Sequence, residues 1–158
     1  MILQDIQERN LEQFYPPEVV PLLARKAAAQ IIGLCQRWRI PESIGVDLCS
    51  LSLYDTIVYI NDSGSMQFEE GGERIRDLQF ILRTVASVST MFNEDGVQLR
   101  FMNANYDPRM LDGIQSEQHI EQLMRTVSFK GLTPMGTAPR QKVIDGIVIP
   151  KIQARRLP

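Results

Sequence analysis

Two loops, residues 61–65 and the loop of Thr133, carry side-chain oxygen atoms that could bind a cation. Ser63 and Ser65 are two positions apart in the sequence Asn-Asp-Ser-Gly-Ser, and side chains two apart in an extended segment point the same way. Thr133 lies in a second loop, residues 131–137, which is rich in turn residues and hydroxyls. Hard cations such as Mg²⁺ prefer oxygen ligands. The two loops therefore predict a cation site that a carboxylate from another molecule can complete, because neutral hydroxyls leave much of the ion's charge unneutralised.

Catalytic alternatives need residues that these loops lack. Asp62 follows an apolar run and could be the nucleophile of an aspartate-based phosphotransferase. Such sites generally need a second acid two residues further on, where this chain has Gly64. The only histidine, His119, lies on a predicted polar helix face, and a serine-hydrolase triad is not predicted. We therefore expect a non-enzymatic protein and assign no catalytic residues.

The elements that must position these loops form a βαβ unit. The second half of the segment 51–60 is a continuous β-branched and aromatic run, which predicts a central strand at residues 56–60, buried on both faces. Apolar residues recur at helical spacing over 75–92, and residues 97–103 alternate as in a strand. The crossover should be right-handed, and ligands of such sheets bind at the carboxyl ends of the strands. The loop at 61–65 occupies that end.

The flanking segments are predicted to be mostly helical. Residues 3–14 form a short helix candidate, Pro17 suits the first turn of the next helix, and an apolar stripe from Val19 to Trp38 ends before Pro41. Ser116 can cap a helix whose apolar side runs to Val127. A last apolar segment covers residues 143–152, and we expect it to pack on the sheet.

Composition excludes several classes of protein. The chain of 158 residues has a net charge of -2 and a pI near 5.5, which offers no basic field for nucleic acid. The sequence contains no run of about 18 apolar residues, so no membrane span is predicted. The first residues lack the basic and then apolar order of a signal peptide. Cys35 and Cys49 are predicted to be buried thiols of a reducing compartment. We therefore expect a cytoplasmic protein with neither nucleic-acid nor membrane partners.

Both loops resemble a known kind of site. Residues 60–66 resemble the metal-ion-dependent adhesion site, D-x-S-x-S, of von Willebrand factor A domains, and residues 131–137 resemble the threonine-bearing loop of that family. Residues 53–59, 68–75 and 97–103 resemble a group of uncharacterised fungal proteins with this domain. The resemblance implies an α/β, Rossmann-like fold with a mostly parallel sheet flanked by helices. It also implies binding of a partner protein, through an acidic side chain of that partner.

Carried over by position, the resemblance implies that Ser63, Ser65, Thr133 and Asn61 hold Mg²⁺ or Mn²⁺. Asn61 stands where the motif has its first aspartate, so it offers a carbonyl oxygen without negative charge. The side chain of Asp62 should point away from the metal. The family's third, acidic loop has no match in the chain. We therefore expect an N-terminal helical extension at residues 1–50 and, at 51–158, an A domain that is incomplete at its C-terminus.

Three alternatives stay open at this point. The chain could be a metal-free interaction scaffold, favoured by the neutral Asn61, or a truncated, non-functional copy. Residues 63–65 could form an ordinary turn between strand and helix, since small polar residues favour such turns. Glu69, Glu70 and Glu73 are interpreted as a solvated acidic rim near a helix N-terminus, where carboxylates are favourable.

Overall fold

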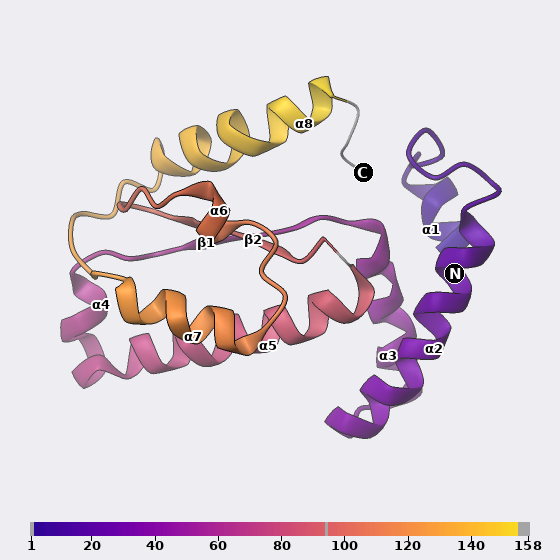
Figure 1. Ribbon diagram of the computed structural model, residues 1–158, viewed down its shortest axis with the longest axis horizontal. Helices are drawn as coiled ribbons and strands as arrows, with labels where there is room; N and C mark the ends of the chain where they lie inside the picture. The colour runs from indigo at the N-terminus through magenta and orange to yellow at the C-terminus, as the bar shows by residue number, and fades with distance from the viewer. Residues whose placement is uncertain (1, 94, 155–158) are drawn as a thin grey trace.

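The computed structural model describes residues 2–93 and 95–154, and a two-stranded parallel sheet organises them (Figure 1). Strand β1 (Thr56–Ile60) pairs with β2 (Val97–Phe101) in a register that places Thr56 opposite Val97. Helix α5 (Glu73–Phe92) connects them, as the βαβ pattern predicts. The chain is therefore a mixed α/β protein, rich in helix, and the α/β class expected from the sequence is confirmed.

Helices lie on both sides of this sheet (Figure 1). On one side, α5 and α7 (Glu117–Thr126) pack against the apolar face of both strands. This core contains the following buried residues of the strands and the two helices: Ile60, Val97, Leu99, Phe101, Leu82, Ala86, Ile120 and Leu123. On the other side lies the C-terminal helical segment, formed by the π-helix η3 (Arg140–Val148) and α8 (Ile149–Gln153). The carboxyl ends of the strands thus emerge between two helical layers.

Strand β1 is not the central strand that its sequence predicts. Among the described residues it pairs with β2 on one edge only. Four of its five residues are half-buried, and only Ile60 is buried. A continuous apolar run is typical of a central strand that is covered on both faces. In the part of the chain that the structure describes, no strand lies beside the second edge of β1.

The N-terminal third is helical, with some boundaries that differ from expectation. Helix α1 (Ile2–Glu8) ends well before residue 14, and α2 (Val20–Trp38) begins after Pro17, with Pro21 in its first turn. Helix α3 (Glu42–Leu48) follows, and the 3₁₀ turn η1 (Cys49–Leu53) precedes the strand predicted at residues 56–60. The hydroxyl of Tyr15 donates to the carbonyl of Leu53 at 2.9 Å, which attaches this turn to the connection between α1 and α2.

A second apolar core holds these N-terminal helices against the βαβ unit. It includes Ile6, Leu34 and Leu53 together with Phe92, the last residue of α5. Packing therefore continues across the expected boundary at residue 50. Both cysteines are free thiols, Cys49 buried and Cys35 half-buried, and burial raises the pKa of Cys49.

The connections contain short helices and two positions where only glycine fits well. Helix α4 (Ser65–Phe68) and the turn η2 (Glu69–Gly72) lead into α5, while α6 (Pro108–Leu111) precedes α7. Ser116 caps α7 as predicted, because its hydroxyl accepts from the amide of His119 at 3.2 Å. Gly96 has a φ of +74°, and a Cβ there would lie 2.7 Å from the carbonyl oxygen of Ile114. Gly131, in the second loop, has a φ of +96°.

The C-terminal segment covers the sheet with few apolar contacts of its own. Ile147 is buried, whereas Ile144, Ile149 and Ile152 are exposed. An ion pair between Lys151 and Asp55 attaches its far end to the start of β1. No helix in residues 2–93 and 95–154 is both long and apolar enough to span a bilayer.

Candidate functional site

The loop after β1 brings three of the predicted ligands together. The Oδ1 atom of Asn61 accepts a hydrogen bond from the amide of Ser63 at 2.9 Å, which closes the turn. The hydroxyl oxygens of Ser63 and Ser65 lie 3.1 Å apart, within hydrogen-bonding distance. Ser63 is buried, Asn61 is half-buried and Ser65 is exposed. A cluster of neutral oxygens therefore reaches the surface at the carboxyl end of β1.

Asp62 points to the neighbouring strand and is used inside the protein. Its side chain is fully buried. Its Oδ1 accepts from the amide of Asn103 at 2.7 Å and from Nδ2 of the same residue at 3.2 Å, while its Oδ2 accepts from the amide of Ala104 at 2.9 Å. Buried carboxylates need such partners, because an unpaired buried charge is very costly. Asp62 thus joins the first loop to the residues that follow β2.

The second predicted loop lies directly against the first. The amide of Lys130 donates to the carbonyl of Asp62 at 2.8 Å, and the amide of Gly64 donates to the carbonyl of Gly131 at 3.2 Å. The Nδ2 atom of Asn103 also donates to the carbonyl of Leu132 at 3.0 Å. Thr133 is the next residue, and it is exposed. The structure brings the loop of Thr133 to the serine loop, and a shared ion between the Thr133 hydroxyl and the serines stays a prediction.

Lys142 is a charged group at this end of the sheet that the sequence did not single out. Its ammonium donates to the carbonyl oxygens of Phe101 and Ala104, both at 2.7 Å. Burial lowers the pKa of Lys142, and the nearby negative charge of Asp62 acts in the opposite direction. Lys142 lies one position before the apolar segment predicted at 143–152, so its place on the helix gave no sign of these contacts. It fastens η3 to the end of β2.

Asn103 was likewise missed as a functional residue, although it was included as the last residue of the predicted second strand. A buried acid directly after a strand requires donors, and the ends of neighbouring parallel strands are where donors can come from. That signal indicates the neighbourhood of Asn103 but not the residue itself. The pairing register decides which side chain reaches Asp62.

The acidic residues near α4 form a surface rim, in agreement with the interpretation from sequence. Glu69 and Glu70 both pair with Arg74, and Glu73 pairs with Arg76, with all of these side chains well exposed. Across the described part of the chain, no group of three or more His, Cys, Asp or Glu side chains is arranged to hold a metal ion. The predicted ligands on the two loops, Asn61, Ser63, Ser65 and Thr133, offer amide and hydroxyl oxygens.

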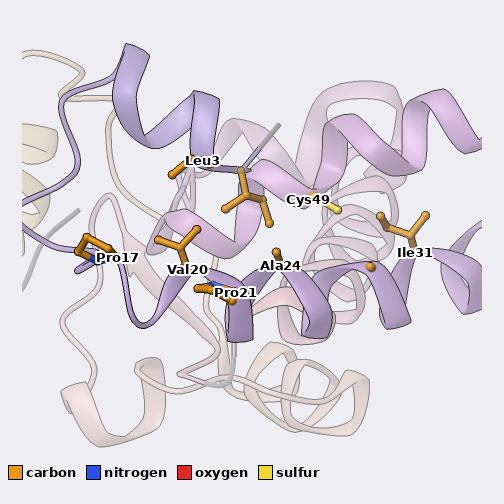
Figure 2. Close-up of a pocket in the computed structure, with 9 residues that line it drawn as sticks. Leu3, Pro17, Val20, Pro21, Ala24, Ile31 and Cys49 are labelled. Atoms are coloured by element: carbon orange, nitrogen blue, oxygen red, sulfur yellow. The ribbon is translucent and has the colours of Figure 1, made fainter.

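An apolar cavity lies in the N-terminal helices, apart from these loops (Figure 2). It has a volume of about 540 Å³ and opens between α1, α2 and the thiol of Cys49. Its lining is apolar, with side chains such as Leu3, Val20 and Ile31. It contains none of the predicted site residues and offers no oxygen ligands for a hard cation.

Comparison of the chain with models of known protein families, with curated proteins and with solved structures found no match in any of the three.

Proposed function

We propose that this chain is a non-enzymatic protein-interaction module of the von Willebrand factor A type, with a degenerate metal-ion-dependent adhesion site. Asn61, Ser63, Ser65 and Thr133 would hold one Mg²⁺ or Mn²⁺ ion. The bound ion would supply a positive charge to which an acidic side chain of a partner protein binds. The finer assignment to a Rossmann-like A domain is part of the same proposal.

The observation that supports this most is the pair of hydroxyl oxygens 3.1 Å apart on Ser63 and Ser65, at the carboxyl end of β1. The loop of Thr133 is hydrogen-bonded to the loop of these serines through Gly64 and Gly131. Ligands of open α/β sheets generally bind at this end of the strands. Oxygen from hydroxyl and amide groups fits Mg²⁺ and Mn²⁺ in kind and does not favour soft ions.

The weak element of this donor set is its charge. Each of the four groups is neutral, and the one buried carboxylate nearby, on Asp62, already accepts three hydrogen bonds from Asn103 and Ala104. A bound ion would keep most of its positive charge, so affinity in the absence of a partner should be low. An anionic partner would then contribute a large share of the binding free energy.

A metal-free interaction surface is the second candidate. The hydrogen bond from the amide of Ser63 to Asn61 orders the loop without any ion. The same loops could then present their hydroxyls and the exposed Leu132 directly to a partner. An aspartate-based phosphotransferase is a weaker alternative, because the buried Asp62 carboxylate accepts hydrogen bonds at both of its oxygens.

Titration calorimetry with Mg²⁺ and Mn²⁺ tests the proposal. Asn61→Asp keeps the acceptor for the Ser63 amide and adds a negative charge, so it should tighten Mn²⁺ binding by roughly ten- to a hundredfold. Ser65→Ala removes one hydroxyl ligand and should weaken binding by a similar factor. Ser43→Ala, at an exposed hydroxyl on α3, is the matched control and should change nothing.

The outcomes separate the two candidates. Binding that Asn61→Asp strengthens and Ser65→Ala weakens supports the adhesion-type site. Absence of Mn²⁺ binding by both the natural chain and Asn61→Asp would refute the metal site and leave the metal-free surface.

A further inference from the structure

Asn103 occupies the junction between the two loops and contacts three segments of the chain. Its amide and its Nδ2 both donate to Oδ1 of Asp62, at 2.7 and 3.2 Å. Its Nδ2 also donates to the carbonyl of Leu132 at 3.0 Å. One side chain, two residues beyond the end of β2, therefore bonds to the loop of Ser63 on one side and to the loop of Thr133 on the other.

The contact with the second loop is so close that a side chain at Gly131 would have to displace the side chain of Asn103. A Cβ at Gly131 would lie 2.8 Å from Oδ1 and 2.9 Å from Cγ of Asn103, nearer than real Cβ atoms approach. The positive φ of +96° at Gly131 independently favours glycine. The amide of Asn103 thus fills the space between the loops and sets how closely they approach.

Beyond Gly131, side-chain packing contributes little to the position of the second loop. The side chain of Leu132 is 83% exposed, so it does not anchor the loop in the core. Backbone bonds from Lys130 and Gly64 fasten the loop only as far as Gly131. The bond from Asn103 to the carbonyl of Leu132 is the next attachment, and it immediately precedes Thr133.

We propose that Asn103 is a positioning residue that sets the separation between the serine hydroxyls and Thr133, and so determines whether both loops can act on one ligand. The link to a shared ion rests on the proposed function. The control of loop separation does not, because it follows from the contacts of Asn103 with Asp62, Leu132 and Gly131.

Hydrogen exchange of the backbone amides tests this role directly. Asn103→Ala keeps the backbone bond to Asp62 but removes the bond to Leu132. Exchange of the Gly64 and Lys130 amides, which bond the two loops to each other, should then accelerate by roughly three- to tenfold, as expected for one lost hydrogen bond. Exchange in β2 should not change. Asn105→Ala, at an exposed asparagine two residues further on, is the matched control and should leave exchange of the Gly64 and Lys130 amides unchanged.

Gly131→Ala provides a second variant that leaves Asn103 in place. Its new Cβ must displace the Asn103 side chain, so the variant should accelerate exchange of the same amides. If Asn103→Ala fails to fold, Gly131→Ala still tests whether Asn103 positions the loop. Both variants should also weaken Mn²⁺ binding by about tenfold or more, as loss of a supporting partner does.

The two proposals fail separately. If neither the natural chain nor Asn61→Asp binds Mn²⁺, the metal site is refuted, while the exchange result still tests Asn103. If the Gly64 and Lys130 amides of folded Asn103→Ala and Gly131→Ala both exchange as in the natural chain, Asn103 does not position the loop and the inference is overturned.

Discussion

Replacement of Asp62 by asparagine should strongly destabilise the protein, although the two side chains have nearly the same shape. The carboxylate of Asp62 is fully buried and accepts three hydrogen bonds, two of them from the backbone amides of Asn103 and Ala104. An asparagine has only one acceptor oxygen. Its NH₂ group would therefore face one of the two backbone amides as a second donor.

The size of the effect follows from these contacts. A buried amide left without an acceptor costs about 1–3 kcal/mol. The remaining bonds lose an ionised acceptor, which lowers the contribution of each by about 1 kcal/mol. A neutral amide is easier to bury than a carboxylate, and this offsets part of the loss. We expect the free energy of unfolding to fall by about 2–4 kcal/mol, which corresponds to a melting temperature lower by roughly 5–15 °C for a chain of this size.

Urea unfolding followed by far-UV circular dichroism measures this change, and fluorescence of Trp38, the only tryptophan, reports on the N-terminal helices in the same samples. Glu121→Gln is a suitable control, because it neutralises an exposed carboxylate that pairs with Arg83. It should alter the free energy of unfolding by no more than about 1 kcal/mol. A loss of less than about 1 kcal/mol for Asp62→Asn would refute the role assigned to its hydrogen bonds.

Three further predictions concern stability and are checked by urea unfolding at a series of pH values. Lys142→Met should lower the free energy of unfolding by about 1–3 kcal/mol at pH 7, because two hydrogen bonds from an ammonium are lost. Burial lowers the pKa of Lys142 in the folded chain, so the unfolded chain keeps this proton to higher pH. The natural chain should therefore gain stability over the variant as pH rises from the lowered pKa to the ordinary value of 10.5. A difference that does not change with pH would contradict this. Tyr15→Phe should cost about 1 kcal/mol below pH 10. Burial raises the pKa of Tyr15 to about 12 in the folded chain. The contribution of the neutral hydroxyl to the free energy of unfolding is therefore fully present below pH 10 and is lost as pH rises towards 12. If the natural chain is still more stable than Tyr15→Phe at pH 12, this bond does not have the assigned role. Gly96→Ala should cost about 2 kcal/mol or more, because its Cβ would meet a backbone carbonyl at a positive φ. Gly33→Ala, inside α2 with open space around it, should instead stabilise by about 0.5–1 kcal/mol, and equal effects of the two would count against the steric argument.

Local signals in the sequence determined much of the secondary structure. Apolar spacing indicated α2, α5 and α7, Ser116 indicated the start of α7, and the order strand, helix, strand indicated the parallel pairing of β1 with β2. The same signals placed Asn61, Ser63 and Ser65 on one loop, where they do lie together. The helices and the loop depend on residues close in sequence, so periodicity and turn residues are enough to predict them. The parallel pairing follows from the order strand, helix, strand.

The strand predicted at residues 56–60 is confirmed as β1, but its predicted central position in the sheet is wrong. Before it, Leu51 and Leu53 join the N-terminal core through a 3₁₀ turn. The apolar run of β1 predicted a central strand, but it contains no information about which segments lie beside it. In the described residues that neighbour is β2 alone.

The surroundings of the site depend on long-range contacts that no local pattern predicts. Asp62 finds its donors 41 and 42 residues away, at Asn103 and Ala104, and the ammonium of Lys142 reaches the same strand end from the C-terminal segment. Such contacts depend on the register of the strands and on how helices pack against them. From the sequence one can predict that a cluster of oxygen atoms follows β1, because these residues are neighbours along the chain. The fold is needed to see that the carboxylate of Asp62 holds the strand ends together and that Asn103 lies between the loops.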